Sequence, residues 1–131
     1  LTKWAGALPQ LHLPAEGKCP SGFIVICQDT RISENLTAYL RDVGITAQTM
    51  LLAAVEKGLG GCMIGSFQKE ELKTALEIPE YLVPMLVLAI GAPDEEIVLE
   101  DACGTITYYR DEKGVHHVPK RTMEELVISR K

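Results

Sequence analysis

The chain has 131 residues, of which 47% are hydrophobic and 24% are charged, and its formal net charge is −5. These values are typical of one globular domain with a buried core, and they exclude the basic surface of a nucleic-acid-binding domain. No apolar stretch reaches the roughly 20 residues of a membrane span, and the N-terminus lacks a signal-peptide pattern. The sequence therefore favours a single cytoplasmic domain over residues 1–131, with no membrane or nucleic-acid partner.

The first part of the chain is irregular apart from one strand. Residues 1–21 are rich in proline and glycine and are expected to form no regular element. The run FIVIC, residues 23–27, predicts a short buried strand because it combines β-branched side chains with a length of only five. Residues 28–35 carry turn and cap residues and are expected to form a loop.

The strongest pattern predicts a helix over residues 36–57. Asn35 or Asp42 could cap its start, and Gly58 just beyond the last turn marks its end. Between residues 43 and 55 apolar side chains cover nearly the whole circumference, which is typical of a helix buried on all sides. Two arrangements satisfy this pattern equally well. One is a subunit interface, and the other is a position between a sheet and neighbouring elements of the same chain.

Short strands and helices alternate after this helix. GCMI, residues 61–64, predicts a short strand or an extended segment, and Ser66 could cap a helix over residues 67–77. The apolar run LVPMLVLAIG, residues 82–91, predicts a central strand with a proline near its start.

The C-terminal part is predicted to contain a hairpin and a closing helix. The acidic stretch at residues 94–101 is expected to be a surface loop. Residues 105–118 predict two short strands around a Lys-Gly turn, and TMEELVI, residues 122–128, predicts a short helix with Thr122 as its cap. The alternation indicates an α/β or α+β fold.

The cysteines and histidines give no metal or redox pattern. The four cysteines are Cys19, Cys27, Cys62 and Cys103. Their spacing matches no metal site, and Cys27 and Cys62 lie within apolar runs, so both are expected to be small core residues. His116 and His117 are adjacent and would point to opposite faces of a strand, which makes them a poor ligand pair.

The segment GLGGCMIGSF is unusually rich in glycine. Its four glycines are Gly58, Gly60, Gly61 and Gly65. A dinucleotide-binding fingerprint must open a helix, whereas these glycines follow one, and the segment lacks the Gly-Lys-Ser/Thr ending of a P-loop. A helix C-cap and a turn explain Gly58 and Gly60 but not the other two. Gly65 and Ser66 would leave backbone N–H groups free at the start of the next helix, which makes this a candidate ligand site.

A second candidate site is the basic pair in HHVPKR. Lys120 and Arg121 precede the closing helix and could bind a phosphate. The alternative, which the sequence alone favours, is a pair of solvated surface cations.

Taken together, three stretches resemble the nitroreductase family of flavoproteins. They are DVGITAQTMLLAAVEKGLGGCMIGSF, EELKTALEIPEYLVPMLVLAIGAP and VHHVPKR, and they match the C-terminal two-thirds of that family in order and spacing. The resemblance implies an α+β fold around a mixed sheet with flanking helices. It also implies a homodimer with the long helix at its interface and FMN bound between the subunits.

The resemblance assigns roles to two groups of residues. It implies that Met63, Ile64, Gly65 and Ser66 lie against the isoalloxazine, with the N–H groups of Gly65 and Ser66 near flavin N5 and O4. Lys120 and Arg121 match the basic pair that the family places on the FMN phosphate. No catalytic side chain and no metal ligand is assigned.

Two motifs of the family do not occur among these residues: an Arg-rich N-terminal motif and a later PSxxNxQPW-like motif. Because the chain also begins at Leu1, we expect the sequence to lack the N-terminal segment of the domain. The implied function is an FMN-dependent oxidoreductase that uses NAD(P)H to reduce nitroaromatics, quinones or similar acceptors. The alternatives are a flavin-binding homologue without turnover and a non-catalytic dimerising fragment.

Overall fold

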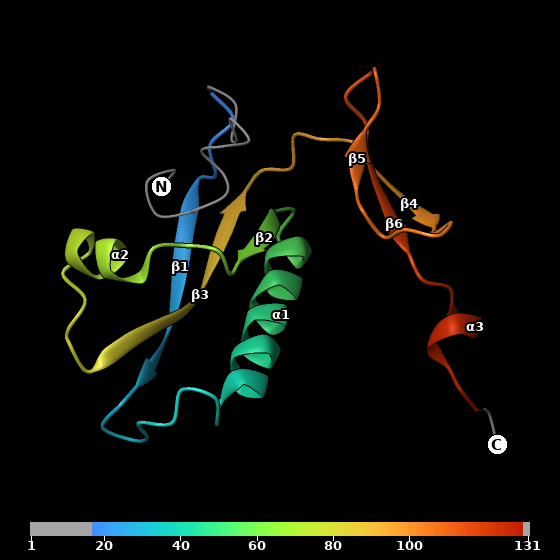
Figure 1. The fold of residues 1–131 in the computed structure, drawn as a ribbon. Coiled ribbons are helices and arrows are strands. Elements are labelled where there is room, and N and C mark those ends of the chain that lie inside the picture. Colours follow the sequence, from blue (N-terminus) through green and yellow to red (C-terminus); the bar gives the residue numbers. More distant parts are fainter. Residues whose placement is uncertain (1–16, 130–131) are drawn as a thin grey trace. The chain divides into compact units, whose positions relative to one another are not determined.

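The computed structural model describes residues 17–129 (Figure 1). The chain divides into two compact units, Leu1–Pro93 and Asp94–Lys131, and each is described by itself. Most of the segment expected to be irregular, residues 1–21, lies outside the described residues. Whether the two units act as one domain stays a prediction.

The first unit is built on an antiparallel sheet of three strands. These are β1 (Gly22–Asp29), β2 (Gly60–Ile64) and β3 (Leu82–Gly91), in the order β1-β3-β2. Strands form at all three predicted places, and β3 is central as predicted. The prediction that residues 23–27 are buried is wrong, because Phe23 and Ile24 are exposed and the next three residues are half-buried. The apolar run of β3 suits that position, because its strand neighbours lie on both sides and Val87, Leu88 and Ala89 are buried.

A proline is accommodated in the central strand by an irregularity of register. Ile26 pairs with Leu86, but the next residue, Cys27, pairs with Pro84, so β3 carries one extra residue at this point. A proline cannot donate a ladder hydrogen bond, and such bulges are among the few places where a sheet tolerates one. Pro84 is fully buried.

One long helix, α1 (Leu40–Glu56), packs on β2 and β3 through the small buried side chains Ala47 and Ala54. Its end is as predicted, since Gly58 has a φ of 74° and its N–H bonds to the carbonyl of Val55.

The predicted caps at the start of α1 are wrong. The N-cap is Tyr39, and no side chain caps the helix. The Oδ1 atom of Asn35 instead accepts hydrogen bonds from the N–H and hydroxyl of Thr37. It thereby stabilises the turn that precedes the helix, whereas Asp42 lies inside the first helical turn.

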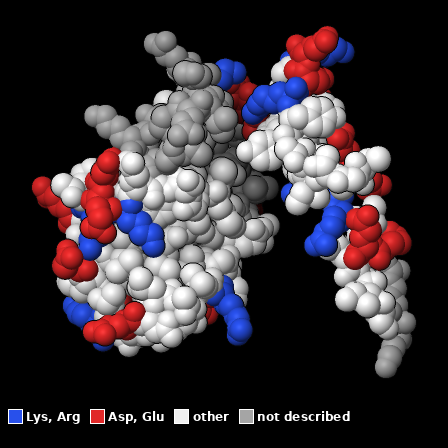
Figure 2. Space-filling model, in the orientation of Figure 1, with Lys and Arg blue, Asp and Glu red and all other residues white. Residues whose placement is uncertain are grey.

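The outer face of α1 is exposed. Ile45, Leu52 and Val55 are 65%, 60% and 63% exposed. Few charged side chains lie over this helix in the space-filling view (Figure 2). Within residues 17–129, α1 is therefore covered on one side only. Both arrangements that the sequence allows for this helix stay predictions.

A short helix, α2 (Lys69–Ala75), follows β2 and buries Leu72. The prediction that Ser66 caps this helix is wrong, because the helix begins three residues later with Gln68 at the N-cap position. The segment between Gly65 and Gln68 has no regular structure. The helix ends at Ala75 with Leu76 as its C-cap, and the residue after Leu76, Glu77, has a positive φ of 51°.

The second unit is a small mixed sheet with a terminal helix. Its elements are β4 (Ile97–Asp101), β5 (Tyr109–Arg110), β6 (His116–Lys120) and α3 (Met123–Leu126). The strand order is β4-β6-β5, with β4 parallel and β5 antiparallel to β6. The predicted loop at residues 94–101 is therefore wrong, because most of it forms β4. The predicted hairpin is confirmed, with Gly114 at a φ of 82°.

The closing helix has its predicted cap. Thr122 accepts a hydrogen bond from the N–H of Glu125, whose carboxylate accepts one from the N–H of Thr122. This reciprocal pair is a capping box. Together the two units give the mixed α and β content that the sequence predicts.

Candidate functional site

The first candidate site is the end of β2 and the segment that follows it. Met63 and Ile64 are the last two residues of β2, an edge strand, and Gly65 and Ser66 come directly after them. Met63, Gly65 and Ser66 are exposed, and Ile64 is half-buried. In the described part of the chain, neither the N–H of Gly65 nor that of Ser66 donates a hydrogen bond to the protein. The segment therefore presents two adjacent free donors beside apolar side chains.

Three of the four glycines in this region are explained by the fold itself. Gly58 needs its positive φ to end α1. A Cβ atom on Gly60 would lie 3.3 Å from Cγ of Pro93. A Cβ on Gly61 would lie 2.5 Å from Cδ2 of Leu51, so the close packing of α1 on β2 requires this glycine.

Gly65 is different. Its φ is not in the left-handed region, and a Cβ atom placed on it would meet nothing within 4 Å. Neither backbone strain nor packing within the described residues therefore calls for glycine at this position. The open space beside its backbone is the kind that an external group can enter.

The free donors belong to an extended segment rather than to a helix. The sequence predicts the N–H groups of Gly65 and Ser66 at the start of the second helix, but that helix begins only at Lys69. Any ligand atom at Gly65 would therefore be held by individual N–H groups, without the contribution of a helix terminus.

The second candidate site lies in the second unit. Lys120 is the last residue of β6, Arg121 follows it, and both side chains are exposed. Neither forms an ion pair with any residue between 17 and 129. Met63, Ile64, Gly65 and Ser66 thus form one short segment of the first unit. Lys120 and Arg121 are consecutive residues of the second unit.

Both histidines take part in contacts that the sequence did not reveal. The ring of His117 stacks on Tyr109 with centroids 4.7 Å apart, and its Nδ1 lies 3.1 Å from Oε2 of Glu100. His116 instead meets the ring of Tyr108 edge-on at 5.4 Å. These neighbours become visible only once β4 and β5 are paired with β6. Among the described residues no group of three or more potential ligands could hold a metal ion.

Electrostatic effects in the second unit concern surface pairs. Arg110 donates a short hydrogen bond to Glu95, and this bond holds the pKa of the Glu95 carboxyl below its ordinary value. Burial and the neighbouring Glu100 raise the pKa of Tyr109. None of these groups belongs to the predicted site residues.

The four cysteines are free thiols. Cys27 is half-buried in β1, and burial raises the pKa of its thiol. The prediction that Cys62 is a core residue is wrong, because it is exposed on the edge strand β2. An apolar run does not distinguish an edge strand from a central one.

Comparison with known proteins identifies the family. The model of the nitroreductase family matches residues 21–92. A Cr(VI) reductase of Pseudomonas sp. is 36% identical over 63 residues, which are 47% of this chain and 26% of that protein. An FMN reductase (NADPH) of Bacillus subtilis is 35% identical over 63 residues, which are 47% of this chain and 25% of that one. The solved structure of NfrA1 nitroreductase from B. subtilis aligns with a TM-score of 0.51 at 26% identity, covering 58% of this chain and 39% of that one.

The fold is thus an α+β fold of the nitroreductase type, and the chain belongs to the nitroreductase family. It spans about a quarter of the length of each of the two curated relatives. No helix in the described range combines the length and the apolar character needed to cross a membrane. A cytoplasmic location stays a prediction.

Proposed function

We propose that the protein is an FMN-dependent oxidoreductase that uses NAD(P)H to reduce acceptors such as nitroaromatics or quinones. The observation that carries this proposal is Gly65, a glycine with free space beside it and an unpaired N–H. Family membership supports it, and so do the activities by which two relatives are named, an FMN reductase and a Cr(VI) reductase.

The residues at the end of β2 fit the ring of a flavin. The N–H groups of Gly65 and Ser66 can donate to electron-rich ring atoms, and the absence of a side chain at Gly65 lets the backbone approach a flat ring. Met63 and Ile64 offer apolar surface beside these donors. When bound, FMN would accept a hydride from NAD(P)H and pass electrons to the acceptor. This chain would supply binding and orientation, and no side chain is assigned a proton transfer.

Lys120 and Arg121 fit the phosphate of FMN. Both are exposed cations without a competing carboxylate in the described range, and an Arg side chain can bind phosphate with two parallel hydrogen bonds. Each charge-assisted contact is worth about 1.5–3 kcal/mol, so replacing both residues with alanine should weaken FMN binding at least tenfold.

The control for this experiment is a double variant of two other exposed cations, Arg41→Ala with Lys113→Ala, which changes the net charge by the same amount. FMN titrations of the two double variants separate a local contact from a general charge effect. Equal affinities in the two variants would remove Lys120 and Arg121 from the site.

We further propose that the exposed face of α1 is the interface of a homodimer. Leu52 and Val55 are apolar and about three-fifths exposed on a helix that packs on the sheet by its other side. Leu52→Glu should therefore shift the protein from dimer to monomer in sedimentation velocity. Ile106→Glu, at an equally exposed apolar residue of the second unit, should leave the dimer intact. A monomeric wild-type protein would contradict the proposal.

A further inference from the structure

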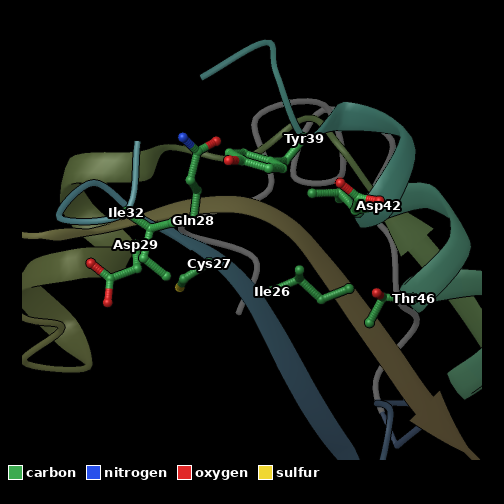
Figure 3. A pocket seen from close by; sticks show the side chains of 9 residues that line it. Ile26, Cys27, Gln28, Asp29, Ile32, Tyr39, Asp42 and Thr46 are labelled. Carbon is green, nitrogen blue, oxygen red and sulfur yellow. The ribbon is translucent and has the colours of Figure 1, made fainter. Parts of the chain in front are cut away.

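A cavity lies in the first unit. It has a volume of about 260 Å³ and opens between the C-terminal half of β1, the loop that follows it and the first two turns of α1 (Figure 3). Its lining residues are Ile26, Cys27, Gln28, Asp29, Ile32, Tyr39, Asp42, Val43 and Thr46. None of the residues proposed to contact FMN belongs to this set.

A buried acceptor without a partner forms part of the wall. Gln28 is only 7% exposed. Its Nε2 donates to the carbonyl oxygens of Ser33 and Asn35, at 2.8 and 3.1 Å, and two acceptors at this end fix which end of the amide is nitrogen. The Oε1 atom is buried and has no hydrogen-bond partner among the described residues. A buried acceptor left unpaired costs about 1–3 kcal/mol, and in Figure 3 this end of Gln28 points toward Tyr39.

The other polar groups of the wall are also free to bind a ligand. Gln28 and Tyr39 point toward one another at one side of the pocket, and Thr46 projects from α1 toward Ile26 (Figure 3). The hydroxyl groups of Tyr39 and Thr46 form no hydrogen bond with the described residues, and neither does the carboxylate of Asp42. These groups surround an apolar floor that includes Ile26.

The charged side chains that line the cavity indicate which kind of ligand fits it. Two carboxylates line the cavity, but Asp29 is already held by Arg31, whose Nε and Nη2 lie 3.0 and 2.6 Å from its oxygens. Asp42 is therefore the one carboxylate of the lining without a cationic partner in the described part of the chain. The lining contains no lysine or arginine. The Cys27 thiol stays protonated near neutral pH, because burial raises its pKa.

We infer that this cavity binds a small organic ammonium compound. The ammonium group pairs with the carboxylate of Asp42, and the apolar body of the ligand lies against Ile26, Ile32 and Val43. The cavity is large enough for a single aromatic ring with a short amine arm. The inference does not depend on FMN binding, because it involves a different set of residues.

The test uses benzylamine as the probe and benzyl alcohol as its uncharged counterpart of nearly the same shape. Methyl resonances of Ile26, Ile32 and Val43 are followed by NMR while each compound is titrated into the purified protein. Benzylamine should shift these resonances in a saturable way, with an affinity about tenfold higher than that of benzyl alcohol, because the hydrogen bonds of an ammonium group are charge-assisted. If benzyl alcohol binds as tightly, or if the methyl resonances do not move, the inference is wrong.

Two substitutions in α1, each of which removes one negative charge, identify the side chain that binds the amine. Asp42→Asn should weaken benzylamine binding at least fivefold, whereas Glu56→Gln, at the far end of the same helix, should leave it unchanged. A crystal structure grown with benzylamine gives an independent readout. Density for the amine beside Asp42 supports the inference, and density for ordered water alone in the cavity overturns it.

Discussion

Gly61 and Gly65 lie four residues apart, and the structure gives opposite expectations for placing alanine at each of them. At Gly61 the added Cβ would lie 2.5 Å from Cδ2 of Leu51 and 2.9 Å from the carbonyl oxygen of Ala89. The leucine methyl can move aside, but the carbonyl belongs to the backbone of the central strand. Overpacking of this kind costs about 1–3 kcal/mol, so Gly61→Ala should lower the free energy of unfolding by that amount.

At Gly65 the added Cβ would meet nothing within 4 Å, and the backbone does not need a positive φ. Gly65→Ala should therefore leave stability unchanged or raise it by about 0.4–1 kcal/mol, because alanine restricts the unfolded chain. The same Cβ fills the space through which a flavin ring would approach the backbone. FMN affinity should then fall at least tenfold in a variant that is no less stable than the wild type.

The assay combines urea unfolding of the FMN-free proteins with FMN titration followed by flavin fluorescence. The expected pattern is that Gly61→Ala loses stability and that Gly65→Ala loses affinity. If Gly65→Ala is destabilised as much as Gly61→Ala, then Gly65 has a structural role. If Gly65→Ala is stable and binds FMN as the wild type does, then the end of β2 is not the flavin site.

Two further predictions concern stability alone. Glu77 occupies the left-handed region at the end of α2, and this backbone conformation costs a residue with a side chain about 1–2 kcal/mol. Glycine adopts it without that cost, so Glu77→Gly should raise the midpoint of thermal unfolding. A lowered midpoint would contradict the reasoning. Arg110 holds the pKa of Glu95 below its ordinary value of 4.5, so this pair stabilises the fold above that pH and its contribution is lost as the pH falls further. The difference in melting temperature between the wild type and Glu95→Gln should therefore be largest near neutral pH and vanish in acid, and a difference independent of pH would refute this.

The sequence predicts those features of the fold that depend on local residue patterns. The end of α1 at Gly58 and the cap at Thr122 are each specified by residues within one turn. The apolar run of β3 is long enough to indicate a central strand. These predictions are confirmed because the signal and the structure it produces lie in the same short segment.

Features that depend on distant partners are predicted less well. The acidic residues of β4 lead to the prediction of a loop. In the structure the segment alternates between exposed and less exposed residues, with Ile97 and Leu99 exposed and Val98 half-buried. This strand depends on its pairing with β6, which the local sequence does not reveal. Gly61 has no explanation in its own segment, because the reason for it is Leu51, on the helix that packs against it. The cap of α1 is mispredicted for a local reason, since Asn35 stabilises the preceding turn instead.

The candidate site shows the same division. The glycine-rich pattern leaves Gly61 and Gly65 without a local explanation, and the structure is needed to separate the two. The origin that the sequence predicts for the free donors at Gly65, a helix start at Ser66, is wrong. The cavity beside Gln28 has no signal in the sequence. It arises where β1, a loop and α1 meet, and no single stretch of the chain encodes that meeting.

The central claim, that this protein binds FMN at the end of β2 and uses it with NAD(P)H, is tested most directly by a visible absorption spectrum. The purified protein is incubated with FMN, separated from free FMN by gel filtration, and its spectrum is recorded before and after addition of NADPH or NADH. We predict that a flavin band elutes with the protein and is bleached by at least one of the two nucleotides. A colourless protein peak would contradict flavin binding, and a flavin band that neither nucleotide bleaches would contradict the proposed activity.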